Sequence, residues 1–295
     1  AQVENAMEIS NEGLELELQA DILRESAVSW RMKFNMARNW NRFEKSYSGK
    51  DVVDGDGTLL VVGRPLNGLY VWAHRGYYNS DAEVPRLYKI DGQEIYFNGV
   101  ATNGISGAVG DYRLLDLDGD GNPDSYYAGS PLPLAHGGWV NELMWKNFDL
   151  NVLVNFTIGR KMINNRMGLG FSRQSEDGHL TKLFDYRKLR PWDGVNKKPN
   201  APAWGNSLSM NTDSAIEKVH HLALKQITLG YNLPDRISKK AGLSGVRFFL
   251  TAENLFYLSN YSGGNPEVVN IYTGRDNGDT YPLPRKYTLG LTLNF

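Results

Sequence analysis

Strict alternation of apolar and polar residues is the feature that most constrains how this chain folds. From Leu14 to Ile22 every second residue is apolar, and the residues between are acidic or amide side chains. The segment from Val28 to Met36 repeats the pattern after a short turn of sequence RESA. A period of two places all the apolar side chains on one face of an extended strand. The two segments therefore predict a β-hairpin with one apolar and one polar face.

The polar faces of this predicted hairpin are complementary in charge. The first strand carries Glu15, Glu17 and Asp21, and the second carries Arg31 and Lys33. Opposite charges that face each other on neighbouring strands favour antiparallel pairing. We therefore expect the acidic side chains of the first strand to lie beside the basic side chains of the second.

The same alternation predicts further strands along the chain. The segments from Trp139 to Trp145 and from Phe148 to Ile158 flank a two-residue Lys146-Asn147 turn, and Leu153 is the one break in the pattern of the second segment. Later candidates are Leu222 to Tyr231, Val246 to Tyr257 and Lys286 to Phe295. Each is close to the ~9 to 11 residues that a tilted membrane-spanning strand needs. The sequence therefore predicts an all-β fold.

The predicted connections fall into two lengths. RESA and Lys146-Asn147 are tight turns, whereas the stretches from about Gly159 to His220 and from Leu258 to Arg285 are long and rich in Gly, Pro and Asn. Outer-membrane barrels combine short periplasmic turns with long external loops. Connections of ~60 residues are uncommon in compact soluble domains. The pattern favours a transmembrane antiparallel β-barrel with long extracellular loops over a soluble sandwich or jelly roll.

Composition agrees with a membrane-spanning sheet. Hydrophobic residues make up 41% of the chain, but no run of the ~18 apolar residues that a membrane-spanning helix requires is present. Any membrane span must therefore consist of strands. Aromatic residues make up 12%, which suits a barrel with aromatic girdles at both membrane interfaces. Lipid-facing membrane anchors are predicted at Trp30, Phe34, Trp139 and Trp145.

Charge and cysteine content narrow the possible functions. A net charge of −1 provides no broad basic surface for a phosphate backbone, which argues against nucleic acid as a partner. The chain has no Cys, so it has no disulfide, thiol nucleophile or thiolate metal site. The five His residues show no metal-ligand spacing, and no serine lies in a nucleophile-elbow motif. We expect no enzyme activity.

Several stretches resemble a known family in their order along the chain. The three last predicted strands lie in LKQITLGYNLP from Leu224, VRFFLTAENLFYLSNYSGGNPEV from Val246 and YPLPRKYTLGLTLNF from Tyr281. Upstream are NEGLELELQADI, VSWRMKFNMARNWN, VGRPLNGLYVW and WKNFDLNVLVNFTIG. Together they resemble the SusC/RagA-like TonB-dependent outer-membrane transporters of Bacteroidetes.

The resemblance implies a 22-stranded barrel whose lumen is filled by a plug. Residues 1–295 would form its carboxyl-terminal strands and extracellular loops, at most about half of a barrel. We expect the plug, the TonB-binding box and the amino-terminal domains to lie outside these residues. The implied location is the outer membrane of a Gram-negative cell. The implied partners are a SusD-like lid lipoprotein, TonB acting through the plug, the barrel-assembly machinery, outer-membrane lipid and the remaining amino-terminal part of the barrel.

The function that the resemblance implies is TonB-dependent import of glycan or peptide oligomers beneath a SusD-like lid. An alternative is a barrel that has a structural or interaction role in an outer-membrane complex without import. A third possibility is a secreted β-rich glycan-binding protein, which would stay soluble without detergent. The periodicity of the strands disfavours this third reading.

The last predicted strand ends on an aromatic residue. Its apolar positions alternate with polar or small residues. This ending resembles the signal by which the barrel-assembly machinery recognises its clients. The residues of the predicted signal are Tyr287, Leu289, Leu291, Leu293 and Phe295.

The segment DLDGDGNPD is a candidate Ca²⁺ loop, because oxygen ligands at alternate positions suit this cation. Gly121 occupies the sixth position of an EF-hand-like loop, but Tyr127 replaces the bidentate Glu of the twelfth. The alternative is a solvated acidic loop whose Asp-Gly steps form turns. Strand direction places the loop outside the cell, where a weak site of ~10⁻⁴ to 10⁻³ M can fill. The candidate ligands are Asp116, Asp118, Asp120, Asn122 and Asp124.

Aromatic residues in the long predicted loops are candidate cargo contacts. A flat aromatic face can stack on a sugar ring or on an apolar side chain of a peptide. Packing within the loops or contact with a lid is the alternative for each. The candidates are Phe184, Tyr186, Trp192 and Trp204.

Overall fold

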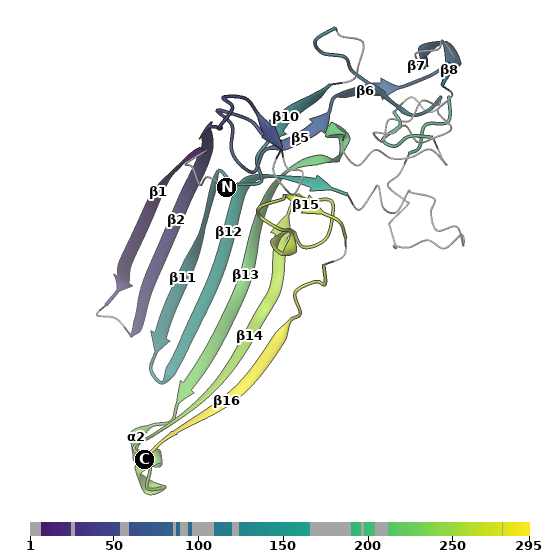
Figure 1. Ribbon diagram of the computed structural model, residues 1–295. Helices are drawn as coiled ribbons and strands as arrows, with labels where there is room; N and C mark the ends of the chain where they lie inside the picture. Colours follow the sequence, from purple (N-terminus) through teal and green to yellow (C-terminus); the bar gives the residue numbers. More distant parts are fainter. Residues whose placement is uncertain are drawn as a thin grey trace, which may run out of the picture.

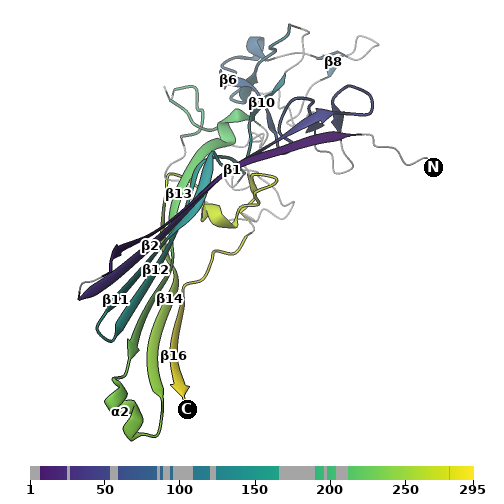
Figure 2. The ribbon, with the colours of Figure 1, turned by 90° about the vertical axis from the view of Figure 1, so that its left-hand side faces the viewer.

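The fold consists of one long sheet with a loop-rich region at one end (Figure 1). The computed structural model describes residues 7–24, 27–53, 59–84, 109–119, 124–165, 190–195, 198–203, 212–278 and 280–295, and the backbone of short strands at 87–88 and 94–95. A view turned by 90° shows that the sheet is bent and that its strands cross the view at an angle (Figure 2).

The main sheet is built from long strands that pair in the order β1-β2-β11-β12-β13-β14-β16. All these neighbours are antiparallel. The two-residue β15 (Arg275–Asp276) adds a short parallel pairing to β12. This antiparallel sheet confirms the fold class predicted from alternation. The strand bounds are β1 Glu8–Leu23, β2 Val28–Lys45, β11 Ala135–Trp145, β12 Phe148–Asn164, β13 Ile216–Asn232, β14 Gly245–Ser259 and β16 Lys286–Asn294.

The register of the sheet keeps apolar residues on one face across every strand. Residues directly opposite each other in an antiparallel pair share a face. One such row runs through Trp145, Phe148, Tyr231, Phe248 and Leu291. The apolar face is not covered by any other described part of the chain: Leu250 is 47% exposed and Leu289 is 82% exposed.

Most strands extend beyond the bounds that alternation predicts. β1 begins at Glu8 rather than Leu14, and β2 continues to Lys45 rather than ending at Met36. β12 reaches Asn164 through a register shift at Gly159, whose φ is 71°. Backbone pairing continues there although the side chains no longer alternate. In the β12 extension the adjacent residues Met162 and Ile163 are both fully buried, so both sides of the strand are covered by apolar neighbours. Alternation therefore marked the amphipathic part of each strand and not its full length.

The tight connections lie at one end of the sheet and the loop-rich region lies at the other (Figure 1). The Lys146-Asn147 turn joins β11 to β12, and Lys146 has a positive φ of 53°. β13 passes to β14 through a short helix, α2 (Asp235–Lys240), which the pattern of residues does not predict. Among the described residues, no helix is long and apolar enough to cross a membrane.

The loop-rich region contains short two-stranded pairings: β3 with β4, β5 with β10, β6 with β9, and β7 with β8. Two buried clusters occupy this end, one around Val71 and Ile163, the other around Met162 and Val219. The compact core of the described chain therefore lies where β12 and β13 enter the loop-rich region. The element bounds are β3 Val52–Val53, β4 Leu59–Leu60, β5 Leu69–Trp72, β6 His74–Tyr77, η1 Asp81–Glu83, β7 Leu87–Tyr88, β8 Glu94–Ile95, β9 Tyr112–Leu114, β10 Ser125–Gly129, η3 Asp213–Ala215 and η4 Pro266–Val268.

Candidate functional site

The polar face of the sheet carries ion pairs that link neighbouring strands. Arg31 of β2 donates from Nε to Asp21 Oδ1 of β1 at 2.6 Å. Lys33 of β2 donates from Nζ to Glu142 Oε1 of β11 at 2.8 Å. The first pair confirms the expected contact between the acidic and basic faces of the hairpin. All four side chains remain partly exposed, so the face is suited to contact with water or polar groups.

A third ion pair spans three strands. Arg247 of β14 contacts Asp149 of β12 through two hydrogen bonds, Nη2 to Oδ2 at 2.5 Å and Nε to Oδ1 at 3.2 Å. Between them, β13 presents Gly230. A Cβ at this position would lie 2.4 Å from Asp149 Oδ1 and 2.5 Å from Arg247 Nη2. The absence of a side chain at Gly230 is therefore what lets the bidentate pair form.

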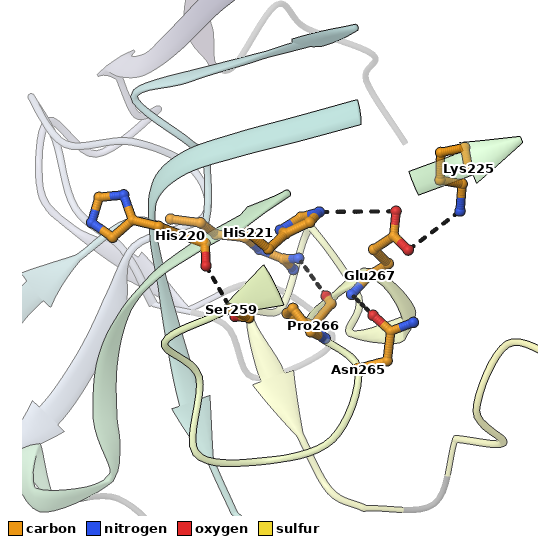
Figure 3. A network of polar contacts seen from close by, with 8 residues as sticks. His220, His221, Lys225, Ser259, Asn265, Pro266 and Glu267 are labelled. Atoms are coloured by element: carbon orange, nitrogen blue, oxygen red, sulfur yellow. Dashed lines mark hydrogen bonds and ion pairs between the residues drawn. The ribbon is translucent and has the colours of Figure 1, made fainter. Parts of the chain in front are cut away.

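A polar network holds the β14–β16 connection against β12 and β13 (Figure 3). Arg160 of β12 is 4% exposed and donates to the carbonyl oxygens of Pro266, Val269 and Asn270 at 3.2, 2.9 and 2.8 Å. A guanidinium has five donors in a fixed plane, so one side chain can satisfy several carbonyls. Arg160 thus anchors the part of the connection that contains η4.

Glu267 of η4 lies between two residues of β13 (Figure 3). Its Oε2 accepts from Lys225 Nζ at 3.3 Å, and its Oε1 lies 3.9 Å from His221 Nε2. The adjacent His220 points away, and its carbonyl accepts from Ser259 Oγ at 2.9 Å (Figure 3). The two neighbouring histidines therefore lie on opposite faces of the strand, as their sequence positions predict.

Two register shifts place the cations of this network. In β13 the pairing passes from Leu224 to Gln226 and leaves Lys225 out. In β12 it passes from Thr157 to Arg160 around Gly159. A bulge redirects the side chains beside it, and here both redirected cations contact the β14–β16 connection. Alternation gives no indication of Arg160, Lys225 or Glu267 as network residues. A glycine within a strand, as at Gly159, is the signal that could have indicated the bulge in β12.

The loop-rich region is joined to the start of β13 through η3. Asp213 Oδ2 accepts from the Tyr126 hydroxyl at 3.1 Å, and Asp213 Oδ1 contacts His74 Nδ1. The His74 ring meets Tyr112 edge-on, with 4.6 Å between ring centroids. Burial raises the pKa of the Tyr112 hydroxyl above its ordinary value. These phenols therefore remain neutral hydrogen-bonding groups, and the arrangement is structural.

One of the predicted cargo-contacting aromatics is in the described part of the chain. Trp192 is half-buried, and its Nε1 donates to Asn79 Oδ1 at 3.2 Å. Its ring covers Gly110, where a Cβ would lie 2.7 Å from the indole. These contacts are those of loop packing, and a role of Trp192 in binding stays a prediction. Phe184, Tyr186 and Trp204 lie outside the described residues.

Three of the five predicted calcium ligands come together. Carboxylate oxygens of Asp116, Asp118 and Asp124 lie within 4.8 Å of one another. Backbone amides hold the loop in this shape, since Leu117 N donates to Asp124 Oδ2 at 2.5 Å and Gly119 N donates to Asp116 Oδ1 at 2.6 Å. Such a set of oxygen donors fits a hard cation. Calcium binding stays a prediction, and Asp120 and Asn122 lie outside the described residues.

The predicted assembly signal lies on β16 and just after it. Its apolar side chains project from the apolar face, and Phe295 is 92% exposed. Among the described strands, β16 pairs only with β14. Ser244 at the end of the α2 connection donates from its backbone N to Asn294 O at 2.8 Å. Recognition of this strand by an assembly machinery stays a prediction.

The sheet is bent and antiparallel, with one exposed apolar face and one ion-paired polar face. Its tight turns lie at one end and its long loops at the other. These features define the class of the fold as a segment of β-barrel wall. The chain superimposes on the solved RagAB peptide transporter with a TM-score of 0.71 and 23% identity, covering 100% of this chain and 30% of that one. The RagAB importer in a closed-closed state gives 0.70 and 21% identity.

Curated sequences identify the relatives more closely. The chain is 25% identical over 319 residues to TonB-dependent receptor P3 of Formosa agariphila, and 26% identical over 305 residues to SusC of Bacteroides thetaiotaomicron. No family model matches the sequence. The chain spans 30% of the length of receptor P3 and 27% of that of SusC. Over its whole length it is therefore similar to a part of several proteins named TonB-dependent receptors, SusC among them.

Proposed function

We propose that this chain forms the carboxyl-terminal barrel wall and extracellular loops of a TonB-dependent importer in a Gram-negative outer membrane. The observation that carries the proposal is the contrast between the two faces of the sheet. The apolar face, with Leu250 and Leu289 exposed, suits lipid hydrocarbon. The opposite face, with the Lys33–Glu142 and Arg247–Asp149 pairs, suits a polar lumen.

The two edges of the sheet require further strands. β1 and β16 each have one neighbour among the described strands. Unpaired backbone groups inside hydrocarbon cost several kcal/mol each, so an open sheet is not stable across a membrane. The chain spans about 30% of the length of the related receptors, so the rest of such a protein can supply those strands. In the proposed importer they close the barrel, and a plug within it transmits energy from TonB.

The proposed cargo is a nutrient oligomer, either a glycan or a peptide, bound at the extracellular loops beneath a SusD-like lid lipoprotein. RagAB is named a peptide transporter, and SusC is named a TonB-dependent receptor; the chain is similar to both. Loop aromatics would supply contact area for the cargo. The acidic loop at Asp116, Asp118 and Asp124 would hold a weakly bound Ca²⁺. No chemical change of the cargo is involved.

The test is uptake by cells that carry the full-length protein. Fluorescent oligosaccharides and oligopeptides are offered to cells with the wild-type protein, without it, and with its TonB-binding segment deleted. The proposal predicts accumulation of one cargo class that requires both the protein and the TonB-binding segment. A correctly inserted protein that supports no uptake of either class would favour the structural or interaction role. Purification from wild-type cells should also recover a lid lipoprotein.

A further inference from the structure

A short basic helix lies at the turn end of the sheet. α2 follows Pro234 and connects β13 to β14 beside the end of β16 (Figure 1). It carries Arg236, Lys239 and Lys240 against a single acid, Asp235. None of the ion pairs between described residues involves these three cations. Their charges are therefore available to a partner.

The burial pattern sets the direction in which α2 presents its cations. Ser238 is fully buried and marks the side of α2 that faces the rest of the protein. At 3.6 residues per turn, Arg236 and Lys240 lie about 20° and Lys239 about 80° from the opposite direction. All three are exposed, and Ile237 at their flank is 52% exposed. The free side of α2 thus combines three cations with one exposed apolar side chain.

An aromatic row marks where the apolar face ends near α2. Four aromatic residues lie opposite one another in adjacent strands, near the strand ends at the turn side of the sheet. They are Trp145, Phe148, Tyr231 and Phe248. The ring centroids of Phe148 and Tyr231 are 4.7 Å apart. Lys146 Nζ lies 5.1 Å from the centre of the Trp145 ring. Aromatic girdles of this kind sit at the level of lipid headgroups.

We propose that the free side of α2, with Lys146, binds the headgroups of anionic phospholipid in the membrane leaflet on the turn side. The inference rests on the membrane placement given under the proposed function. Cations just beyond an aromatic girdle lie at the depth of the lipid phosphates, and Ile237 can enter the boundary between headgroups and acyl chains. The juxtaposition of charge, one apolar residue and the girdle fits a lipid surface better than an acidic protein.

The experiment uses the full-length protein in phosphatidylcholine vesicles with trace amounts of spin-labelled lipid. It compares the association of labelled phosphatidylglycerol with that of labelled phosphatidylcholine. The test variant is R236Q/K239Q/K240Q. The matched control, K45Q/K50Q/R75Q, removes the same charge from exposed residues on the loop side of the sheet. Both must show the wild-type circular-dichroism spectrum and insertion into vesicles.

The wild-type protein and the control are expected to prefer phosphatidylglycerol at low salt, and the α2 variant is expected to lose about fivefold or more of that preference. High salt should weaken the preference because it screens surface charges. Equal preference in the two triple variants, or none in the wild type, overturns the lipid contact and leaves an acidic protein as the partner to seek. Failure of the wild-type protein to insert into vesicles overturns the membrane placement itself.

Discussion

Gly230 lies at the point where Arg247 of β14 crosses β13 to reach Asp149 of β12. The Gly230→Ala substitution would place a methyl group 2.4 Å from the Asp149 carboxylate, so the ion pair must shift or break. We expect a loss of stability of about 1 to 3 kcal/mol, the usual range for overpacking. Thermal or denaturant unfolding of the full-length protein measures it.

Gly138→Ala is the matched control, because its nearest contact would be Asn155 Oδ1 at 3.3 Å. This contact is a flexible side chain, so the loss should be much smaller. If the two substitutions destabilise the protein equally, the ion pair between Arg247 and Asp149 is not the reason why position 230 requires glycine.

Tyr70 has a buried hydroxyl for which no partner is found among the described residues. Removing an unsatisfied polar group is neutral or favourable, so Tyr70→Phe should leave stability unchanged or raise it by up to about 1 kcal/mol. Loss of more than about 1 kcal/mol would contradict the assignment.

The same hydroxyl gives a pH dependence. Burial raises the pKa of Tyr70 to about 12, above its unfolded value of about 10. Ionisation of this group therefore costs no stability below pH ~10, and stability falls as pH rises from there towards the folded pKa, because the unfolded chain loses the proton more readily. Tyr70→Phe should make unfolding less sensitive to pH between about 10 and 12. An unchanged slope of stability against pH would refute the shift.

Residue-level contacts were predictable where they join strands adjacent in sequence. The charges of Asp21 and Arg31 indicated their contact. Lys33 instead pairs with Glu142, and Arg247 with Asp149, because a register across several strands decides which polar residues share a row. No single strand contains that information.

At the scale of elements, the β14–β16 connection depends on Arg160. Arg160→Met would leave the carbonyl oxygens of Pro266, Val269 and Asn270 without their donor. Burying unsatisfied acceptors costs about 1 to 3 kcal/mol each, so the connection should detach locally. Hydrogen exchange of residues 261–276 in the full-length protein should accelerate at least tenfold. Arg113→Met, at an exposed site, serves as the control and should leave exchange unchanged. Equal exchange in both variants would contradict the anchor.

The acidic loop between β9 and β10 gives a ligand-dependent prediction. Terbium luminescence and calorimetry on the full-length protein should show a site for Ca²⁺ with a dissociation constant of ~10⁻⁴ to 10⁻³ M. The double substitution Asp118→Asn and Asp124→Asn should weaken the affinity for Ca²⁺ at least tenfold. Glu83→Gln, an acid of the same region, is the comparison. Absence of binding at millimolar Ca²⁺ would mean that the acidic residues form only turns.

Elements were predictable where side chains alternate and unpredictable where they do not. The central parts of β1, β2, β11 to β14 and β16 follow from period two. The extensions of β2 and β12 do not alternate, since the adjacent Met162 and Ile163 of β12 are both buried, and α2 is too short to leave a periodic pattern. The bulges at Lys225 and Gly159 break the alternation, and they also position the network around Glu267, which is why that network was missed.

At the scale of the whole molecule, alternation across seven long strands predicted an amphipathic sheet, and the resemblance of the carboxyl-terminal segments predicted the kind of receptor. The number of strands in the closed barrel and the nature of the cargo depend on parts of the protein beyond this sheet. The apolar character of a single residue does not always predict which face of the sheet it lies on. Leu153 is apolar, yet it lies in register with Gln226 on the polar face.

The most direct test of the two-faced sheet is a spin-label scan along β12 in the membrane-inserted, full-length protein. Each label is attached to a single cysteine introduced at one of positions 150 to 155. Residues 1–295 contain no natural cysteine that would compete for the label. The account predicts that collision with oxygen is greatest at Leu150, Val152 and Val154, and that Leu153 behaves like its polar neighbours Asn151 and Asn155. Accessibility without a period of two, or entry of a water-soluble nickel complex at Leu150, Val152 and Val154, would contradict a barrel wall.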